Sequence, residues 1–206
     1  LANPNNPTGS YITRDALHRL RSNLPEHIVL VIDGAYSEYV TDPEYSDGSD
    51  LVATTSNTVM LRTFSKIYGI PALRLGWGYA PTAIIDVLNR IRGPFNVTAP
   101  ALAAGIAAVR DQDYLRHVRD YNNKERGRLA TVLAAYGTVY PSAGNFLMID
   151  LGSAARAEKI NAGLMEEGII VREIAAYKLP TFLRISVGTI DENNALLDAM
   201  KKVASA

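Results

Sequence analysis

The sequence contains no cysteine, which excludes disulfide bonds and thiolate metal sites. Its three histidines, His18, His27 and His117, are too widely separated to indicate a zinc cluster. No apolar run approaches the roughly 20 residues that a membrane-spanning helix needs, and no basic segment followed by an apolar one opens the chain. The sequence therefore predicts no metal, no membrane partner and a cytoplasmic location.

An excess of charge of one sign is also missing, because 21 Lys and Arg balance 21 Asp and Glu. A balanced chain gives no reason to expect nucleic acid as a partner. With 206 residues, 48% of them hydrophobic, the chain is long enough to bury a core, and we expect a small molecule as its partner. Leu1 stands where an initiating Met would be, and the first residues are typical of a strand end, so we expect a fragment.

Alternating strand and helix patterns organise the first part of the chain. Strands are predicted at residues 28–32, 58–61 and 75–80, and helices at 13–22, 82–92 and 99–110. The alternation predicts an α/β fold, with a mainly parallel sheet, crossover helices and a first strand that is buried on both faces. Ligands of such sheets bind beyond the carboxyl ends of the strands, where this pattern puts Asp33 and Lys66.

The pattern changes after a long predicted helix at residues 113–135. Strands are predicted at 145–151, 169–172 and 182–187, and helices at 154–167 and 191–203. Strands and helices segregate here as in an α+β unit, so we predict a domain boundary at about residue 120.

Three segments carry candidate chemistry. Asn3-Pro4-Asn5-Asn6-Pro7-Thr8-Gly9 is a cluster of turn formers and, taken alone, could be a surface loop. Asp33, followed by Tyr36, could pair with a cation such as a protonated pyridine nitrogen or could cap a helix. Thr63-Phe64-Ser65-Lys66, with Arg74, combines two hydroxyls, an amine and a guanidinium. Together the three segments favour a site that binds a phosphate ester and an aldehyde, although an isolated lysine would usually be a solvated loop residue.

In this order, the three segments resemble the fold-type I, pyridoxal-phosphate-dependent aminotransferases. Within them the nearest likeness is to the histidinol-phosphate aminotransferases, through residues 62–66, 94–97 and 183–188. The resemblance covers essentially the whole chain. It implies that residues 1–120 are the C-terminal part of the large cofactor-binding domain and that 121–206 form the small α+β C-terminal domain. It also implies a homodimer.

The resemblance assigns a role to each candidate residue. Lys66 would bind pyridoxal phosphate covalently and then act as the base that moves the substrate proton. Asp33 would pair with the ring nitrogen and keep it protonated. The other cofactor contacts would come from Asn6 and Tyr36, to the phenolic oxygen, and from Thr63, Ser65 and Arg74, to the phosphate.

The same resemblance makes Arg184 the residue that binds the substrate's carboxylate or phosphate, with Arg172 as a second anion-binding residue. The implied reaction exchanges an amino group between histidinol phosphate and a 2-oxo acid, 2-oxoglutarate, in histidine biosynthesis. An aromatic or broad-specificity aminotransferase is an alternative, because Arg184 can also receive a carboxylate. A non-catalytic, cofactor-binding regulator domain is another. The family's phosphate-binding loop and ring-stacking aromatic precede the Asn-Pro cluster, so we do not expect the chain alone to hold a complete active site.

Overall fold

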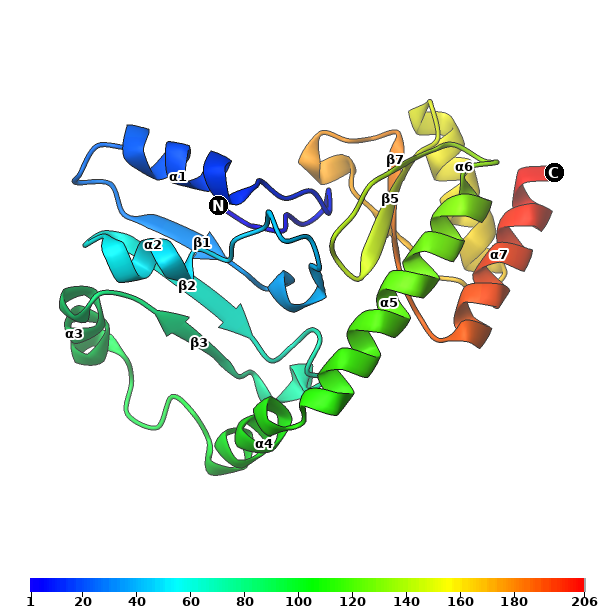
Figure 1. Cartoon of the computed structure of the whole chain (residues 1–206). Coiled ribbons are helices and arrows are strands. Elements are labelled where there is room, and N and C mark those ends of the chain that lie inside the picture. The colour runs from blue at the N-terminus through cyan, green and yellow to red at the C-terminus, as the bar shows by residue number, and fades with distance from the viewer. Residues whose placement is uncertain (206) are drawn as a thin grey trace. The chain divides into compact units, whose positions relative to one another are not determined.

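The computed structural model describes residues 1–205, which divide into two compact units (Figure 1). The first unit contains Leu1–Asn5 and Tyr11–Arg119, and the second contains Asn6–Ser10 and the chain from Asp120 onward. The division falls inside the helix α5 (Gln112–Leu133). Among residues 1–205, no helix is both long enough and apolar enough to cross a membrane.

A three-stranded sheet forms the centre of the first unit, in the order β1 (Leu30–Asp33), β2 (Thr58–Thr63) and β3 (Gly76–Tyr79). β1 and β2 are parallel. β3 runs antiparallel to β2 because the connection between them contains a single 3-10 turn, η2 (Pro71–Leu73), and no crossover helix. With one parallel and one antiparallel pair the sheet is mixed, and Ala2 adds a parallel bridge to Asp33.

Helices cover one face of this sheet beside β1. The helix α1 (Arg14–Asn23), predicted at 13–22, begins after Thr13, whose hydroxyl caps its first turn. Leu17 of α1 packs in one core cluster with Leu51 of α2 (Ser49–Thr54) and with Leu30 and Ile32 of β1. Val31, on the opposite face, is 40% exposed. Val31 alternates with the buried Leu30 and Ile32, so the prediction that this strand is buried on both faces is wrong within residues 1–205.

The two later helices of the first unit match their predicted positions. They are α3 (Thr82–Ile91) and α4 (Ala99–Arg110). Thr98 caps α4 by accepting a hydrogen bond from the Ala101 N–H, and Ala101 packs against Phe64 and Leu75. This contact anchors α4 to both ends of the loop that carries Lys66.

The second unit contains a four-stranded antiparallel sheet. Its order is β4 (Thr138–Tyr140), β5 (Phe146–Asp150), β7 (Phe182–Ser186) and β6 (Arg172–Glu173). The strands predicted at 145–151 and 182–187 are confirmed, whereas β4 was not predicted. The strand predicted at 169–172 is displaced to β6, because Ile169 and Val171 pack into the core next to the turn at Gly168 instead of pairing.

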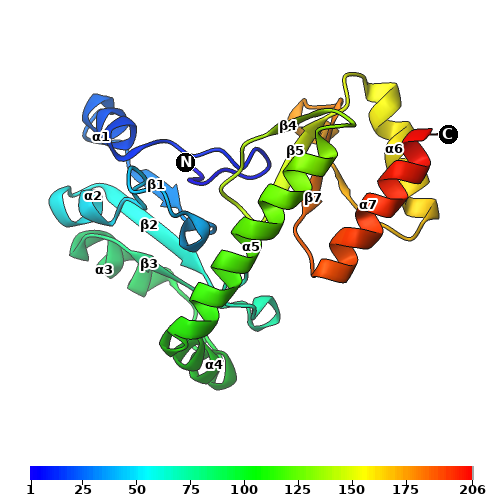
Figure 2. The same cartoon turned by 45° about the vertical axis from the view of Figure 1, so that its right-hand side comes forward.

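The helices α6 (Ala154–Glu166) and α7 (Ile190–Ser205) lie side by side in this unit (Figure 2). With the last turns of α5 they bury one face of the sheet, formed by Leu147, Ile149, Leu183 and Ile185. Side chains alternate between the two faces of a strand, so Arg184 lies on the face opposite these helices. Arg184 of β7 therefore lies on the sheet face that does not contact this hydrophobic core.

Candidate active site

A tight turn at the end of β1 joins Asp33 to Tyr36. The Asp33 carboxylate accepts a hydrogen bond from the Ala35 N–H at 3.1 Å, and the Gly34 N–H donates to the Leu61 carbonyl of β2 at 2.9 Å. A Cβ on Gly34 would lie 2.6 Å from Ser37 Oγ and 3.1 Å from that carbonyl oxygen, so a larger residue would crowd the turn. Tyr36 is buried, while Asp33 is exposed beyond the strand end. Its carboxylate can therefore meet a ligand there.

Lys66 follows β2 in a turn that Thr63 stabilises. The Thr63 hydroxyl accepts a hydrogen bond from the Ser65 N–H at 3.0 Å. Lys66 Nζ lies 5.3 Å from the centroid of the Tyr36 ring. The fold thus brings together two segments that are separated by about thirty residues of sequence, as the strand-end argument predicted.

Arg74 lies close to the same turn. Its Nη1 donates to the Pro71 carbonyl at 2.7 Å and lies 3.4 Å from Ser65 Oγ. Its backbone has a φ of 50°, which is uncommon for a residue other than glycine and is found often at functional sites. A hydroxyl beside an exposed guanidinium can bind the oxygens of a phosphate ester.

The donor set of the first unit fits pyridoxal phosphate. A carboxylate suits its ring nitrogen, a phenol its phenolic oxygen, an amine its aldehyde, and a hydroxyl–guanidinium pair its phosphate. The structure brings Lys66 to Tyr36 and Arg74 to Ser65, so these groups form a connected set rather than scattered surface residues. Among the residues that the structure describes, no group of His, Asp and Glu is arranged to hold a metal ion.

In the second unit, Arg184 forms a hydrogen bond through one guanidinium nitrogen, Nη1, while another, Nε, has no partner among residues 1–205. Its Nη1 donates to Asn6 Oδ1, and its Cζ lies 5.0 Å from the centroid of the Phe146 ring. Its Nε is buried and has no hydrogen-bond partner within residues 1–205. Buried donors usually have a hydrogen-bond partner, so an unpaired Nε needs a water, an ion or a ligand group to satisfy it.

Arg172 of β6 lies directly opposite Arg184 in the register of the sheet. Paired residues of antiparallel strands share a face, and two like charges in such a pair are unfavourable unless an anion neutralises them. Arg172 is exposed at this position. The structure thus pairs the two predicted anion-binding arginines on adjacent strands.

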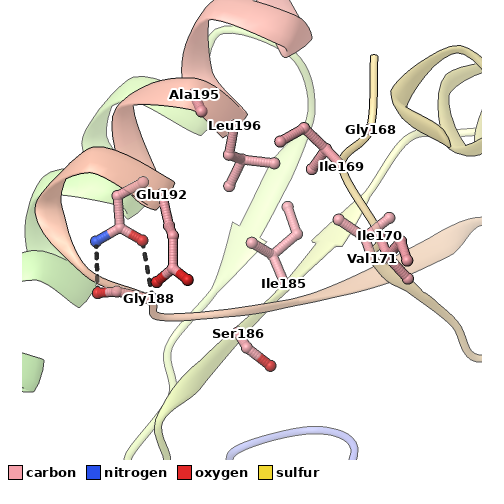
Figure 3. A pocket seen from close by; sticks show the side chains of 11 residues that line it. Gly168, Ile169, Ile170, Val171, Ile185, Ser186, Gly188, Glu192, Ala195 and Leu196 are labelled. Atoms are coloured by element: carbon pink, nitrogen blue, oxygen red, sulfur yellow. Dashed lines mark hydrogen bonds between the residues drawn. The ribbon is translucent and has the colours of Figure 1, made fainter. Parts of the chain in front are cut away.

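A pocket lies on the side of β7 that faces away from Arg184, and apolar side chains form much of its lining (Figure 3). Ile169, Ile185 and Leu196 line it, whereas Arg172 and Arg184 do not. The Glu192 carboxylate at its rim already accepts a hydrogen bond from the Thr189 N–H at 2.7 Å. This pocket is therefore separate from the predicted anion-binding residues.

An ion network that was not predicted supports the site of the first unit. Arg62 Nη1 lies 2.9 Å from Glu38 Oε1, and its Nη2 pairs with Asp47. Burial raises the pKa of Glu38, against the opposing effect of the Arg62 charge. The available signal was a charged residue directly after the strand predicted at 58–61, but its partners could not be read from local sequence.

Asn3 is a second residue whose role was not predicted. It is 1% exposed, its Nδ2 donates to the Ser46 carbonyl at 3.2 Å, and its Oδ1 accepts from the Ile12 N–H at 2.9 Å. The Tyr45 hydroxyl donates to the Asn3 carbonyl at 2.7 Å, and burial raises the pKa of Tyr45 to about 12. The start of the Asn-Pro cluster is thus a buried, fully bonded structure rather than a surface loop.

Comparisons with known proteins agree with this chemistry. The family model for aminotransferases of class I and II matches residues 1–200. The histidinol-phosphate aminotransferase of Granulibacter bethesdensis is 48% identical over 202 residues, which are 98% of this chain and 55% of that protein. That of Dinoroseobacter shibae is 52% identical over 201 residues, 97% of this chain and 55% of that protein.

A solved structure gives the same result. The crystal structure of histidinol-phosphate aminotransferase from Sinorhizobium meliloti in complex with pyridoxal-5'-phosphate has a TM-score of 0.93 and 33% sequence identity. The match covers 100% of this chain and 56% of that one. The chain therefore spans about 55% of the length of the curated relatives it matches.

Proposed function

The chain belongs to the class I and II aminotransferases, and we propose that the complete protein carrying it is a histidinol-phosphate aminotransferase. Its reaction would exchange an amino group between histidinol phosphate and 2-oxoglutarate, in histidine biosynthesis. The observation that carries this choice of substrate is the pairing of Arg172 with Arg184 on one sheet face. Relatives of that name, at 48% and 52% identity, support it.

Pyridoxal phosphate, when bound, supplies an electron-withdrawing ring that makes the substrate's Cα–H acidic. The amine of Lys66 would bind it covalently and, once displaced by the substrate amine, would carry the proton away from Cα. The Asp33 carboxylate would hold a proton on the ring nitrogen. Hydrogen bonds to the phenolic oxygen and the phosphate would come from Asn6, Tyr36, Thr63, Ser65 and Arg74.

Arg184 and Arg172 would bind the acidic group of the substrate. A phosphate dianion has more charge and more acceptor oxygens than a carboxylate, so it can use both guanidinium groups. The register pairing of two like charges, Arg184 and Arg172, supports an anion at this position. An aromatic or broad-specificity aminotransferase would need Arg184 but not Arg172.

We assign the first unit to the large cofactor-binding domain and the second to a small α+β domain. The mixed sheet with flanking helices supports the first assignment, and the antiparallel sheet with helices on one face supports the second. The complete protein would be a cytoplasmic homodimer, in keeping with the family.

The test is a transamination assay on the complete protein that carries this sequence. Purified protein with pyridoxal phosphate is incubated with 2-oxoglutarate and either histidinol phosphate or phenylalanine, and glutamate formation is followed. A higher kcat/KM for histidinol phosphate supports the proposal. A preference for phenylalanine would make the protein an aromatic aminotransferase. Cofactor binding without transamination of either donor would indicate a regulator.

A further inference from the structure

We propose that Arg62 is a positioning residue that holds the Asp33–Tyr36 and Thr63–Lys66 segments at a fixed separation. The inference rests on the proposed cofactor chemistry, in which the two segments bind one ligand from two sides. Arg62 belongs to β2 itself and directly precedes Thr63, so its backbone moves with the lysine-bearing turn. Its side chain reaches the other segment.

The first link from Arg62 is to Glu38. Glu38 belongs to the 3-10 turn η1 (Ser37–Tyr39), which begins immediately after Tyr36. Its carboxylate lies 2.9 Å from Arg62 Nη1, and the two side chains are only 12% and 11% exposed. In addition, a Cβ on Gly34 would lie 3.3 Å from Arg62 Cδ, so the aliphatic part of Arg62 lies against the turn that follows Asp33.

The second link is to Asp47, which fixes Arg62 from another direction. Asp47 pairs with Arg62 Nη2, and its Oδ1 accepts a hydrogen bond from the Ser49 N–H, at the start of α2, at 2.9 Å. The guanidinium is therefore held by two carboxylates on two structural elements. A lysine has a single ammonium nitrogen and no planar fork, so it could not place two separate nitrogens against the two carboxylates.

Separation of the two segments matters because the cofactor would lie between their side chains. Lys66 Nζ is 5.3 Å from the Tyr36 ring centroid, and catalytic groups misplaced by about 1 Å can lose roughly a hundredfold in rate. A change at Arg62 would alter this spacing without removing any group that contacts the cofactor.

The chain offers a matched control in Arg21. Arg21 is also buried in the first unit, at 7% exposure, and donates to the carbonyls of Ile28 and Leu24, each at 2.9 Å. It contacts neither cofactor-binding segment through these bonds. Replacing it by lysine removes a comparable set of buried guanidinium hydrogen bonds and reports the cost to stability alone.

The experiment compares Arg62→Lys with Arg21→Lys in the complete protein. Measured are the thermal midpoint, the dissociation constant of pyridoxal phosphate by absorbance, and kcat and KM for the amino donor. We expect both variants to lose stability, but only Arg62→Lys to bind the cofactor more weakly and to lose about ten- to a hundredfold in kcat, with the donor KM unchanged. Equal cofactor affinity and kcat in the two variants would overturn the role of Arg62.

A third variant separates positioning from charge burial. Arg62→Met combined with Glu38→Gln and Asp47→Asn removes all three charges, so no buried charge is left without its partner. We expect a smaller loss of thermal midpoint than in Arg62→Met alone together with the kcat deficit, and wild-type kcat would overturn the proposal. If this variant does not fold, the Arg62→Lys comparison decides.

A wild-type protein that does not bind pyridoxal phosphate would refute the proposed function itself, whereas normal wild-type binding with unaffected variants refutes only the role of Arg62.

Discussion

Arg184 donates a hydrogen bond through Nη1 to Oδ1 of Asn6, a residue 178 positions away in sequence. Because the amide oxygen of Asn6 is engaged, its NH2 group is the end that can donate to another acceptor. A residue predicted to bind the substrate thereby orients one predicted to bind the cofactor. Both residues belong to the second unit.

This contact predicts that Asn6→Asp damages the chemistry more than the binding of the amino donor. Aspartate keeps an oxygen acceptor for Arg184 but replaces the NH2 donor with a second, negatively charged acceptor. Loss of a hydrogen bond to a charged group costs about 1.5 to 3 kcal/mol, or roughly one to two powers of ten in kcat. Steady-state kinetics of the complete protein test this, and a normal kcat in Asn6→Asp would contradict the role of Asn6.

Asp33→Asn should leave the cofactor bound but slow proton removal strongly. The Asn side chain can still accept the hydrogen bond from the Ala35 N–H, so the turn is expected to survive. A neutral partner no longer keeps the ring nitrogen protonated, and loss of such electrostatic stabilisation costs on the order of a hundredfold in rate. Single-turnover rates with saturating cofactor measure the effect. Near-normal turnover would show that Asp33 does not have this role.

Removal of the Arg172 guanidinium should affect histidinol phosphate more than other amino donors. Arg172→Ala leaves Arg184 to bind a carboxylate, whereas a phosphate loses one of two charged partners, at a cost of about 1.5 to 3 kcal/mol. The specificity constants for histidinol phosphate, phenylalanine and glutamate are compared, with exposed Arg156→Ala of α6 as the control. Equal losses for all three donors would refute phosphate recognition by Arg172.

Glu125 should make the stability of the protein depend on acid pH. Its side chain is 2% exposed. Hydrogen bonds donated by Arg128, which has the larger effect, and by Asn193 hold the pKa of Glu125 below the ordinary value of 4.5. A depressed pKa in the folded state contributes stability that is present above the unfolded pKa and is lost as the pH falls through the folded one.

We therefore predict that Glu125→Gln lowers the thermal midpoint most at neutral pH and that its difference from wild type narrows below about pH 4.5. Glu158→Gln, at an exposed position of α6, serves as the control and should show no such narrowing. A wild-type advantage over Glu125→Gln that stayed constant from neutral to strongly acid pH would contradict the assignment.

The elements that could be predicted from the sequence are those specified by local signals. The helix α4 was predicted at residues 99–110 from its helical pattern, and the structure has the same bounds, with Thr98 as the cap. The strands β4 and β6 have only three and two residues and exist through pairing with β5 and β7. Nothing in so short a segment distinguishes a strand from a loop before the partner is known.

The candidate site shows the same difference between features that local sequence specifies and features that depend on distant residues. The proximity of Lys66 to Tyr36 follows from a general property of parallel strands, whose carboxyl ends meet at one edge of the sheet. The Arg62 ion network and the Arg184–Asn6 contact join residues that are distant in sequence, so their geometry depends on the complete packing. The sequence therefore predicted candidate groups for the site but not the side chains that hold them in place.

Lys66 is the residue on which the proposed function depends most. The most direct measurement is borohydride reduction of the complete protein in the presence of pyridoxal phosphate, followed by proteolysis and mass spectrometry of the peptides. We predict a pyridoxyl group on the peptide that contains Lys66 and its loss in Lys66→Ala. Recovery of the pyridoxyl group on another lysine, such as Lys178, or an adduct that persists in Lys66→Ala, would contradict the assignment.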